Sequence, residues 1–177
     1  MKITHNILEA ISYSARQHLN QFRKDDSTPY HAHPMRVATI AASWGVEDEA
    51  TLIAALLHDT IEDTTTDWDN IAKKFGPDAA NLVAALTKDS RLPEAARETA
   101  YYATLAAAEW RVRVAKLADG YDNLLDSAYA KIPTKALAKA EKALALLAHG
   151  NEAPIVAGRT ALAALVVETK ARAAGAV

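Results

Sequence analysis

The chain has 177 residues, a length that suits one domain and can bury a substantial core. Half of the residues are hydrophobic and 24% are charged, which is typical of a folded protein rather than a disordered one. The 20 basic and 22 acidic side chains leave a net charge of −2, so the chain lacks the basic field that holds nucleic acid, and we expect no nucleic-acid partner. The absence of cysteine excludes disulfides, thiolate zinc sites and cysteine nucleophiles, so any metal site must use histidine and carboxylate.

The sequence shows no targeting or membrane-spanning segment. Its N-terminal stretch lacks the apolar core of a signal peptide, and no apolar run is long enough to cross a bilayer. We therefore expect a cytoplasmic protein without a membrane partner. Alanine, the best helix former, is abundant, whereas glycine and proline number six each, so the composition favours an all-α fold.

The first predicted helix carries hydrophobic residues at three- and four-residue steps from Ile7 to Leu19. A charged, turn-forming stretch follows over residues 23–29. The second predicted helix has Pro34 in its first turn and ends near Trp44, before a glycine.

The third predicted helix begins near the acidic residues 47–49, which complement the helix dipole, and should run past His58 to about Asp63. Further helices are predicted from Trp68 to Phe75, from a cap at Asp78 to about Thr87, from Pro93, from Trp110 to Leu125, from Pro133 to His149 and from Pro154 toward Lys170. The tail from Ala171 to Val177 should fray. No strand, repeat or linker pattern is visible, so we expect a single domain over residues 1–177, built of about eight to ten helices.

Four side chains are candidate ligands of one divalent ion such as manganese: His33, His58, Asp59 and Asp119. They come from three predicted helices. Adjacent residues on a helix point about 100° apart, so His58 and Asp59 can share an ion only near a helix end that faces a cavity. The alternatives are a chance His-Asp dipeptide and a first histidine that is a helix cap or a packed core residue.

Glu62 and Asp63 follow this pair at four-residue spacing, which places each acid on a shared face if the helix continues. Such a cluster repels itself unless a cation or bound protons offset the charge. A solvated acidic helix end is the alternative.

Asp119 and Asn123 repeat the four-residue spacing on the helix predicted from Trp110. Asp119 follows apolar residues, and a buried carboxylate needs a partner. Either a metal ion or Lys116, three residues earlier, could supply it.

Three stretches of the sequence resemble the signature segments of the HD phosphohydrolase superfamily, and in particular the hydrolase domain of RelA/SpoT-type proteins and the stand-alone small alarmone hydrolases. The stretches are HPMRVA (33–38), ALLHDTIEDT (55–64) and VAKLADGYDNL (114–124), and RKDDSTPYHAHP (23–34) resembles the family's opening. The resemblance covers about residues 7–125. Beyond Ala130 the sequence shows no motif of the family. It shows only residues typical of helices, which are expected over 133–170.

The resemblance implies an all-α HD-domain bundle that removes the 3′-pyrophosphate of guanosine tetra- or pentaphosphate, giving GDP or GTP and pyrophosphate. It implies these site residues: His33, His58, Asp59 and Asp119 as ligands of one manganese ion, Glu62 and Asp63 as the acids that position and activate water, and Arg23, Lys24 and Asn123 as nucleotide contacts.

Two departures from the family's pattern bear on substrate choice. Gly120 stands where the family usually has a basic residue, and Asp122 stands where it often has His or Tyr, both beside the expected base and ribose pocket. Adenosine alarmones, another HD-type nucleotide phosphohydrolase activity and a non-catalytic alarmone-binding protein therefore stay open. The oligomeric state also stays open. The candidates for collecting the anionic substrate are Arg23, Lys24, Arg36, Lys88, Arg91 and Lys116.

Overall fold

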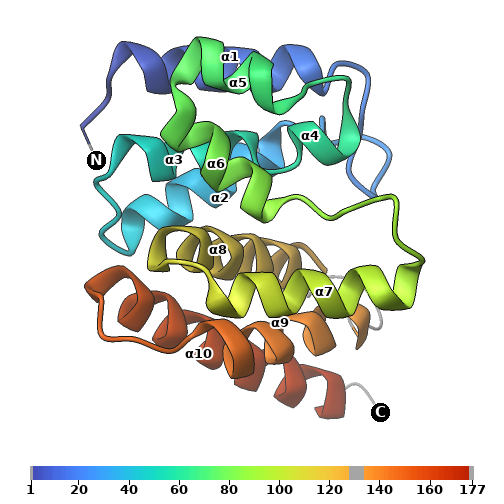
Figure 1. Cartoon of the computed structure of the whole chain (residues 1–177). Coiled ribbons are helices and arrows are strands. Elements are labelled where there is room, and N and C mark those ends of the chain that lie inside the picture. Colours follow the sequence, from blue (N-terminus) through green and yellow to red (C-terminus); the bar gives the residue numbers. More distant parts are fainter. Residues whose placement is uncertain (1, 128–133, 176–177) are drawn as a thin grey trace.

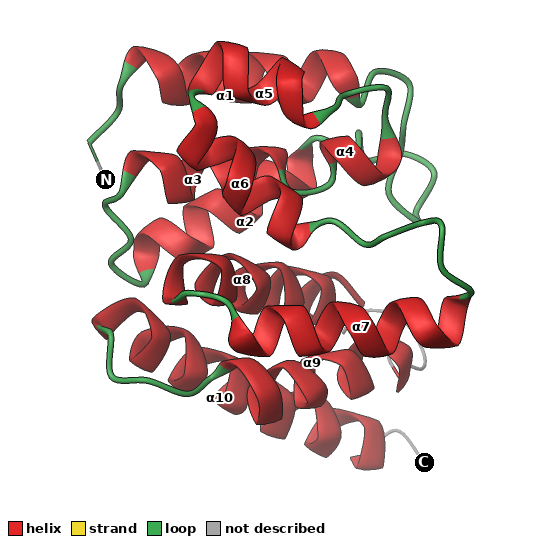
Figure 2. Cartoon of the chain, in the orientation of Figure 1, coloured by secondary structure: helices red, strands yellow, loops and turns green. Residues whose placement is uncertain are grey.

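The computed structural model describes residues 2–127 and 134–175. All elements in these residues are α-helices, apart from one isolated β-bridge between Phe22 and Pro29 (Figure 2). The all-α prediction is confirmed. The helices of the described residues are α1 (His5–Gln17), α2 (Ala32–Ser43), α3 (Glu49–Leu57), α4 (Thr60–Asp63), α5 (Trp68–Phe75), α6 (Pro77–Leu86), α7 (Glu94–Ala107), α8 (Trp110–Ser127), α9 (Thr134–Leu147) and α10 (Ala153–Gly175).

The helices are stacked in layers, which Figure 1 shows from α1 and α5 at the top, through α2, α3 and α6, to α8 and finally to α9 and α10 at the bottom. α3 packs against α1, α2 and α6, and α8 packs against α2, α9 and α10. α2, α3 and α8 also contact one another. Side chains from these three helices can therefore meet at one point inside the molecule.

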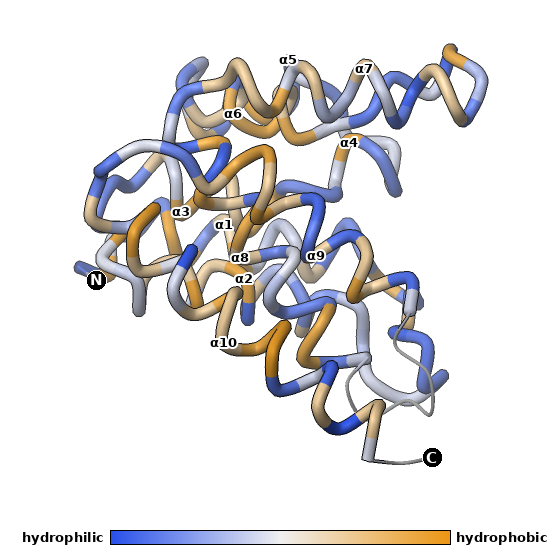
Figure 3. The backbone as a smooth tube through the Cα atoms, turned by 90° about the horizontal axis from the view of Figure 1, so that it is seen from below, coloured by the Kyte–Doolittle hydropathy of each residue, from blue (hydrophilic) through white to orange (hydrophobic). Residues whose placement is uncertain are grey.

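The core is centred on α3. All its residues from Thr51 to Leu57 are buried. The helix carries apolar side chains of its own on every side, so it has no polar face to turn toward water. In Figure 3 the hydrophobic colour is concentrated on α3 and α6. The third signature stretch lies on α8, whose apolar side chains Val114, Leu117 and Ala118 are fully buried in the same core.

The predicted third helix is wrong in one respect, because it does not continue to Asp63. α3 ends at Leu57, and a separate one-turn helix, α4, follows. The interruption has a local cause. The His58 ring donates from Nδ1 to the Ala55 carbonyl, and the Thr60 hydroxyl donates to the Leu57 carbonyl, so side chains occupy the acceptors that a continuing helix would use.

Two other predictions need correction. Asp78 does not cap α6; Gly76 is the N-cap residue and Pro77 occupies the first turn, while the Asp78 carboxylate accepts hydrogen bonds from Arg111. α10 begins one residue before Pro154 and continues to Gly175, beyond the predicted start of fraying.

The turn of α10 just before this stretch is held by partners. Lys170 pairs with Glu141 at 2.5 Å, and Thr169 is buried. The predicted start of a helix at Pro133, the limit at Ala130 and the last two residues of the tail lie outside the described residues. Within the described part of the chain, none of the helices combines the length and the hydropathy that crossing a bilayer requires.

Candidate active site

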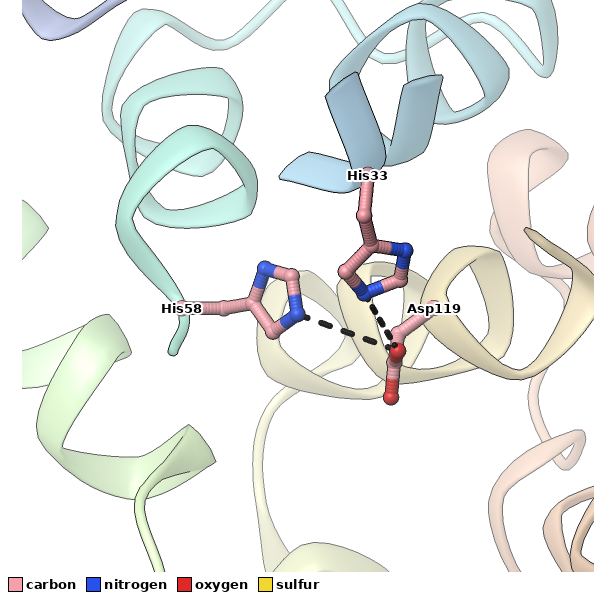
Figure 4. Close-up of side chains that lie close together, drawn as sticks. All are labelled: His33, His58 and Asp119. Atoms are coloured by element: carbon pink, nitrogen blue, oxygen red, sulfur yellow. Dashed lines mark ion pairs between the residues drawn. The ribbon is translucent and has the colours of Figure 1, made fainter. Parts of the chain in front are cut away.

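Three side chains from separate helices converge at the centre of the molecule (Figure 4). His33 Nε2 lies 3.1 Å from Asp119 Oδ1, and His58 Nε2 lies 3.7 Å from the same oxygen. Their potential ligand atoms all lie within 4.8 Å of one another. All three residues are buried, so the polar atoms have little access to bulk water. His33 comes from the first turn of α2, His58 follows α3, and Asp119 lies on α8.

Asp59 faces the same point. Its Oδ2 lies 3.0 Å from His58 Nε2 and 3.7 Å from His33 Nε2, and it accepts a hydrogen bond of 2.7 Å from the Tyr30 hydroxyl. The neighbouring positions 58 and 59 can share a centre because the chain leaves helical geometry between α3 and α4. The structure thus brings together all four side chains that the sequence predicts as ligands.

Hydrogen bonds at Nδ1 direct both imidazole rings. The carbonyl of Ala55 can only accept, so His58 donates to it from Nδ1 and, when neutral, keeps a lone pair on Nε2. His33 Nδ1 lies 2.6 Å from Asp122 Oδ2, which directs its Nε2 toward the centre in the same way. His58 Nε2 is buried without a hydrogen-bond partner.

The unpartnered Nε2 of His58 indicates whether these four residues suit a metal ion. A buried polar atom without a partner is costly, and an ion among the four side chains would supply the missing interaction. Two imidazole nitrogens and two carboxylates form a donor set that suits divalent ions such as manganese or iron. The residues therefore fit the ion that the sequence predicts.

The charges of the cluster shift its pKa values strongly. Burial disfavours protonated His58, but the carboxylates of Asp59 and Asp119 outweigh it and raise the pKa of His58 to about 9. Burial opposes ionisation of Asp119, but the Lys116 ammonium, 2.6 Å from its Oδ2, holds the pKa of Asp119 well below its usual range. The cluster therefore attracts positive charge, whether protons or a metal ion.

A cavity of about 860 Å³ opens beside the cluster, large enough for a nucleotide. Its wall carries six basic side chains among seven acidic ones. The basic residues in the wall are Arg23, Lys24, Lys88, Lys116, Lys135 and Lys139. These six side chains offer counter-charges to an anionic ligand, and a cation in the cluster would offset the acids beside it.

Three predicted nucleotide contacts lie in this wall. The Arg23 guanidinium donates to Asn123 Oδ1 at 3.0 Å and to Asp126 Oδ2 at 2.9 Å. Asn123 in turn donates from Nδ2 to Asp119. Lys24 lines the cavity next to Arg23.

Glu62 and Asp63, on α4, also line the cavity. The Asp63 carboxylate is 3.4 Å from the Tyr30 hydroxyl. Burial and the charges of Asp59 and Glu62 raise the pKa of Asp63. Although the predicted continuous helix is absent, the one-turn helix brings both acids to the side of the cluster.

Some candidates from the sequence do not line the cavity, and some residues of its wall were missed. Asp122 does not line the cavity; its side chain is 1% exposed and binds His33 and Arg36. Of the six basic candidates, Arg36 and Arg91 do not line the cavity; they pair with Asp122 and Asp89. The missed wall residues include Glu98, Tyr101, Tyr102, Lys135 and Lys139. They belong to α7 and α9, for which the sequence offers helical periodicity but no motif.

Known proteins are similar to this chain in sequence and fold. The family model for the HD domain matches residues 10–149. The guanosine-3′,5′-bis(diphosphate) 3′-pyrophosphohydrolase MESH1 of Xenopus tropicalis is 42% identical over 122 residues, which cover 68% of each chain, and the Homo sapiens protein of that name is 40% identical with the same coverage. A solved structure of a metazoan ortholog of SpoT, reported to hydrolyse ppGpp and to play a role in starvation responses, gives a TM-score of 0.83 at 29% identity, over 95% of this chain and 97% of that one. With most of its length matched by the family model, the chain is a member of the HD domain family.

Proposed function

We propose that the protein hydrolyses the 3′-pyrophosphate of guanosine tetra- and pentaphosphate, releasing pyrophosphate and leaving GDP or GTP. The observation that carries this proposal is the cluster of His33, His58 and Asp119 beside a cavity whose wall includes six basic side chains. The relatives at 40% and 42% identity are named for the same reaction. The activity is that of a guanosine-3′,5′-bis(diphosphate) 3′-pyrophosphohydrolase.

The proposed cofactor is one Mn²⁺ ion held by His33, His58, Asp59 and Asp119. The unpartnered Nε2 of His58 and the mixed imidazole and carboxylate donor set support this assignment. Bound there, the ion would polarise the 3′-phosphoryl oxygens and lower the pKa of a water molecule.

Glu62 and Asp63 are the proposed acid–base residues. Because burial and neighbouring charge raise the pKa of Asp63, its carboxylate holds a proton more readily than an ordinary aspartate does. In the reaction a carboxylate takes a proton from the attacking water, the water oxygen bonds to the phosphorus next to the ribose, the bond between that phosphorus and the ribose 3′ oxygen breaks, and the proton is returned to the 3′ oxygen. The proton balance needs no further reactant.

Arg23, Lys24 and Asn123 are the proposed nucleotide contacts. Arg23 is well suited to this work because its guanidinium is already oriented by Asn123 and Asp126, so little side-chain entropy is lost on binding. The lysines around the cavity neutralise the substrate's phosphates. Since no glycine-rich phosphate loop occurs in the sequence, these side chains carry the phosphate recognition.

The test is turnover with manganese on guanosine and adenosine alarmones, with chromatographic identification of the products. We expect pyrophosphate and the nucleoside 5′-diphosphate or 5′-triphosphate from an alarmone, and no reaction with GTP, whose 3′ hydroxyl is free. Release of orthophosphate from GTP or ATP at the alarmone rate would favour a general nucleotide phosphohydrolase. Faster turnover of adenosine alarmones would change the base assignment, and binding without turnover would identify an alarmone-binding protein.

Asp59→Ala is the matching variant for this assay. It removes half of the ion's neutralising charge, so we expect metal binding and turnover to be lost while the helical circular dichroism is retained. Full activity of this variant with supplemented manganese would contradict the ligand assignment.

A single HD-type domain over residues 1–177, a cytoplasmic location and the absence of a nucleic-acid partner stay predictions.

A further inference from the structure

Asp122 makes an unusual contact for its place in the sequence. It precedes Asn123, where the resemblance leads one to expect a His or Tyr beside the nucleotide. Instead its side chain is buried, with 1% exposure, and Oδ2 lies 2.6 Å from Nδ1 of His33. An ionised carboxylate can only accept, so the ring nitrogen is the donor.

Arg36 holds this carboxylate in place. Its Nε donates to Asp122 Oδ1 at 2.7 Å, and its Nη2 donates to Oδ2 at 3.0 Å. A two-point contact between a guanidinium and a carboxylate fixes the plane of both groups. Arg36 lies one helical turn after His33 on α2, so the ligand and the guanidinium meet Asp122 of α8 from the same helix.

The two histidines of the cluster therefore have different partners on Nδ1. His58 donates to a neutral backbone carbonyl, whereas His33 donates to a charged carboxylate. A carboxylate on the outer nitrogen of a metal-bound imidazole fixes the ring and makes the inner nitrogen a stronger donor. Asp122 should consequently affect the metal through His33 alone.

We infer that Asp122 is a positioning residue, which Arg36 holds in place and which aims Nε2 of His33 at the metal ion. This inference rests on the proposed metal site. It gives a function to the position at which this chain departs from the family's usual residue. Asp122 touches neither the ion nor the nucleotide, because it acts through the imidazole ring.

Asp126 offers a matched control one turn further along α8. It also accepts a hydrogen bond from Arg36, at 3.1 Å, but it has no contact with His33. The changes Asp122→Asn and Asp126→Asn therefore remove the same charge from the same helix and weaken the same guanidinium partner. They differ in the contact with His33, which Asp122 alone makes. Asp126→Asn also weakens the hydrogen bond from Arg23, so the two variants are compared in manganese binding and not in turnover.

The experiment is calorimetric titration of manganese into the wild-type protein and both variants, with circular dichroism to verify the fold. We expect Asp122→Asn to weaken manganese binding by roughly 10- to 100-fold, as outer-sphere changes on metal-bound histidines do. Asp126→Asn should bind manganese within about twofold of the wild-type protein. Equal weakening in both variants would attribute the effect to net charge and overturn the inference, as would an Asp122→Asn protein that binds like the wild type.

A second measurement needs no variant, in case Asp122→Asn fails to fold. In the wild-type protein loaded with diamagnetic zinc, the Nδ1 proton of His33 should give a slowly exchanging, far-downfield NMR resonance, because a buried carboxylate accepts it. Absence of that resonance from the zinc-loaded protein would overturn the inference. A wild-type protein that binds no divalent ion would contradict the metal site itself and the role of Asp122 with it.

Discussion

Asp119 shows how one carboxylate can serve several neighbours. Its Oδ1 faces His33 and His58, while its Oδ2 accepts a hydrogen bond from Lys116. The sequence leaves a metal ion and Lys116 as alternative partners for this buried acid. In the structure the two oxygens face different ways. Lys116 binds Oδ2, whereas Oδ1 accepts a hydrogen bond from Asn123 and faces the two histidines, so an ion would bind at Oδ1.

The two acids of α4 can be separated experimentally from the ligands. We expect Glu62→Gln combined with Asp63→Asn to keep manganese bound and to slow hydrolysis by roughly 10²–10⁴-fold, the range for loss of general acid–base catalysis. The measurements are single-turnover kinetics and manganese titration of the same preparation. Loss of the ion in the double variant would instead identify these carboxylates as ligands or as supports of the ligands.

Metal binding should release protons. Burial lowers the pKa of His58 in the metal-free protein, but the charge of Asp59 outweighs burial and raises it to about 9. Near neutral pH the ring therefore carries a proton that must leave before a metal ion can bind. Affinity for manganese should therefore fall as the pH falls, by up to about tenfold per pH unit for one displaced proton. Calorimetry in buffers of different ionisation enthalpy measures the protons released. An affinity that is constant between neutral and mildly acidic pH would contradict this prediction.

At the level of helices, local sequence predicts some boundaries well and misses others for a physical reason. α5 begins and ends where predicted, because Asp67 and Asn70 form a reciprocal capping box and Gly76 ends the helix with a positive φ of 89°. The end of α3 was missed, because periodicity does not reveal that the His58 and Thr60 side chains occupy backbone carbonyls.

The same contrast applies to the site. The metal-ligand set follows from three motifs, each of which is readable within a few residues. The orientation of Asp122 and the lysines of α9 depend on how α2, α8 and α9 pack together, which a motif does not encode. The spacing of Asp119, Asp122 and Asp126 on one helix face was the available signal for the network on α8.

Two helical glycines should respond in opposite ways to the same substitution. A Cβ on Gly158 of α10 would lie 2.7 Å from the Trp44 ring, which is itself held by an edge contact with Tyr121, whereas a Cβ on Gly120 of α8 would meet nothing within 4 Å. Gly120→Ala should raise the free energy of unfolding by up to about 1 kcal/mol through helix propensity. Gly158→Ala should lower it by up to about 2 kcal/mol, because overpacking costs roughly 1–3 kcal/mol and the propensity gain offsets only about 1 kcal/mol of it.

Urea unfolding of both alanine variants in the metal-free state measures these changes. A Gly158→Ala protein as stable as Gly120→Ala would show that the indole ring yields without cost. Either result reports on the packing of α10 against α2, because Trp44 directly follows α2.

In the whole molecule, charged side chains of both signs gather around one cavity. The chain has a net charge of −2, and six basic and seven acidic side chains line this cavity. The net charge argues against a nucleic-acid partner, but it does not show where the charged side chains gather, because composition does not record position. The acidic ligands lie in the same wall as the basic side chains, so an ion and a polyanion can be held next to each other.

The origin of the metal ligands in three distant helices also has a kinetic consequence. His33, His58 and Asp119 meet only after α2, the end of α3 and α8 have docked, which requires closing long loops. We therefore expect manganese to bind after the rate-limiting step of folding. It should stabilise the protein by lowering the unfolding rate. At about a hundredfold excess over its dissociation constant the ion adds about 2.7 kcal/mol, which corresponds to unfolding about a hundredfold slower, with the refolding rate almost unchanged. Stopped-flow measurements with and without manganese test this, and refolding that accelerates by the same factor would mean that the ligands assemble before the barrier.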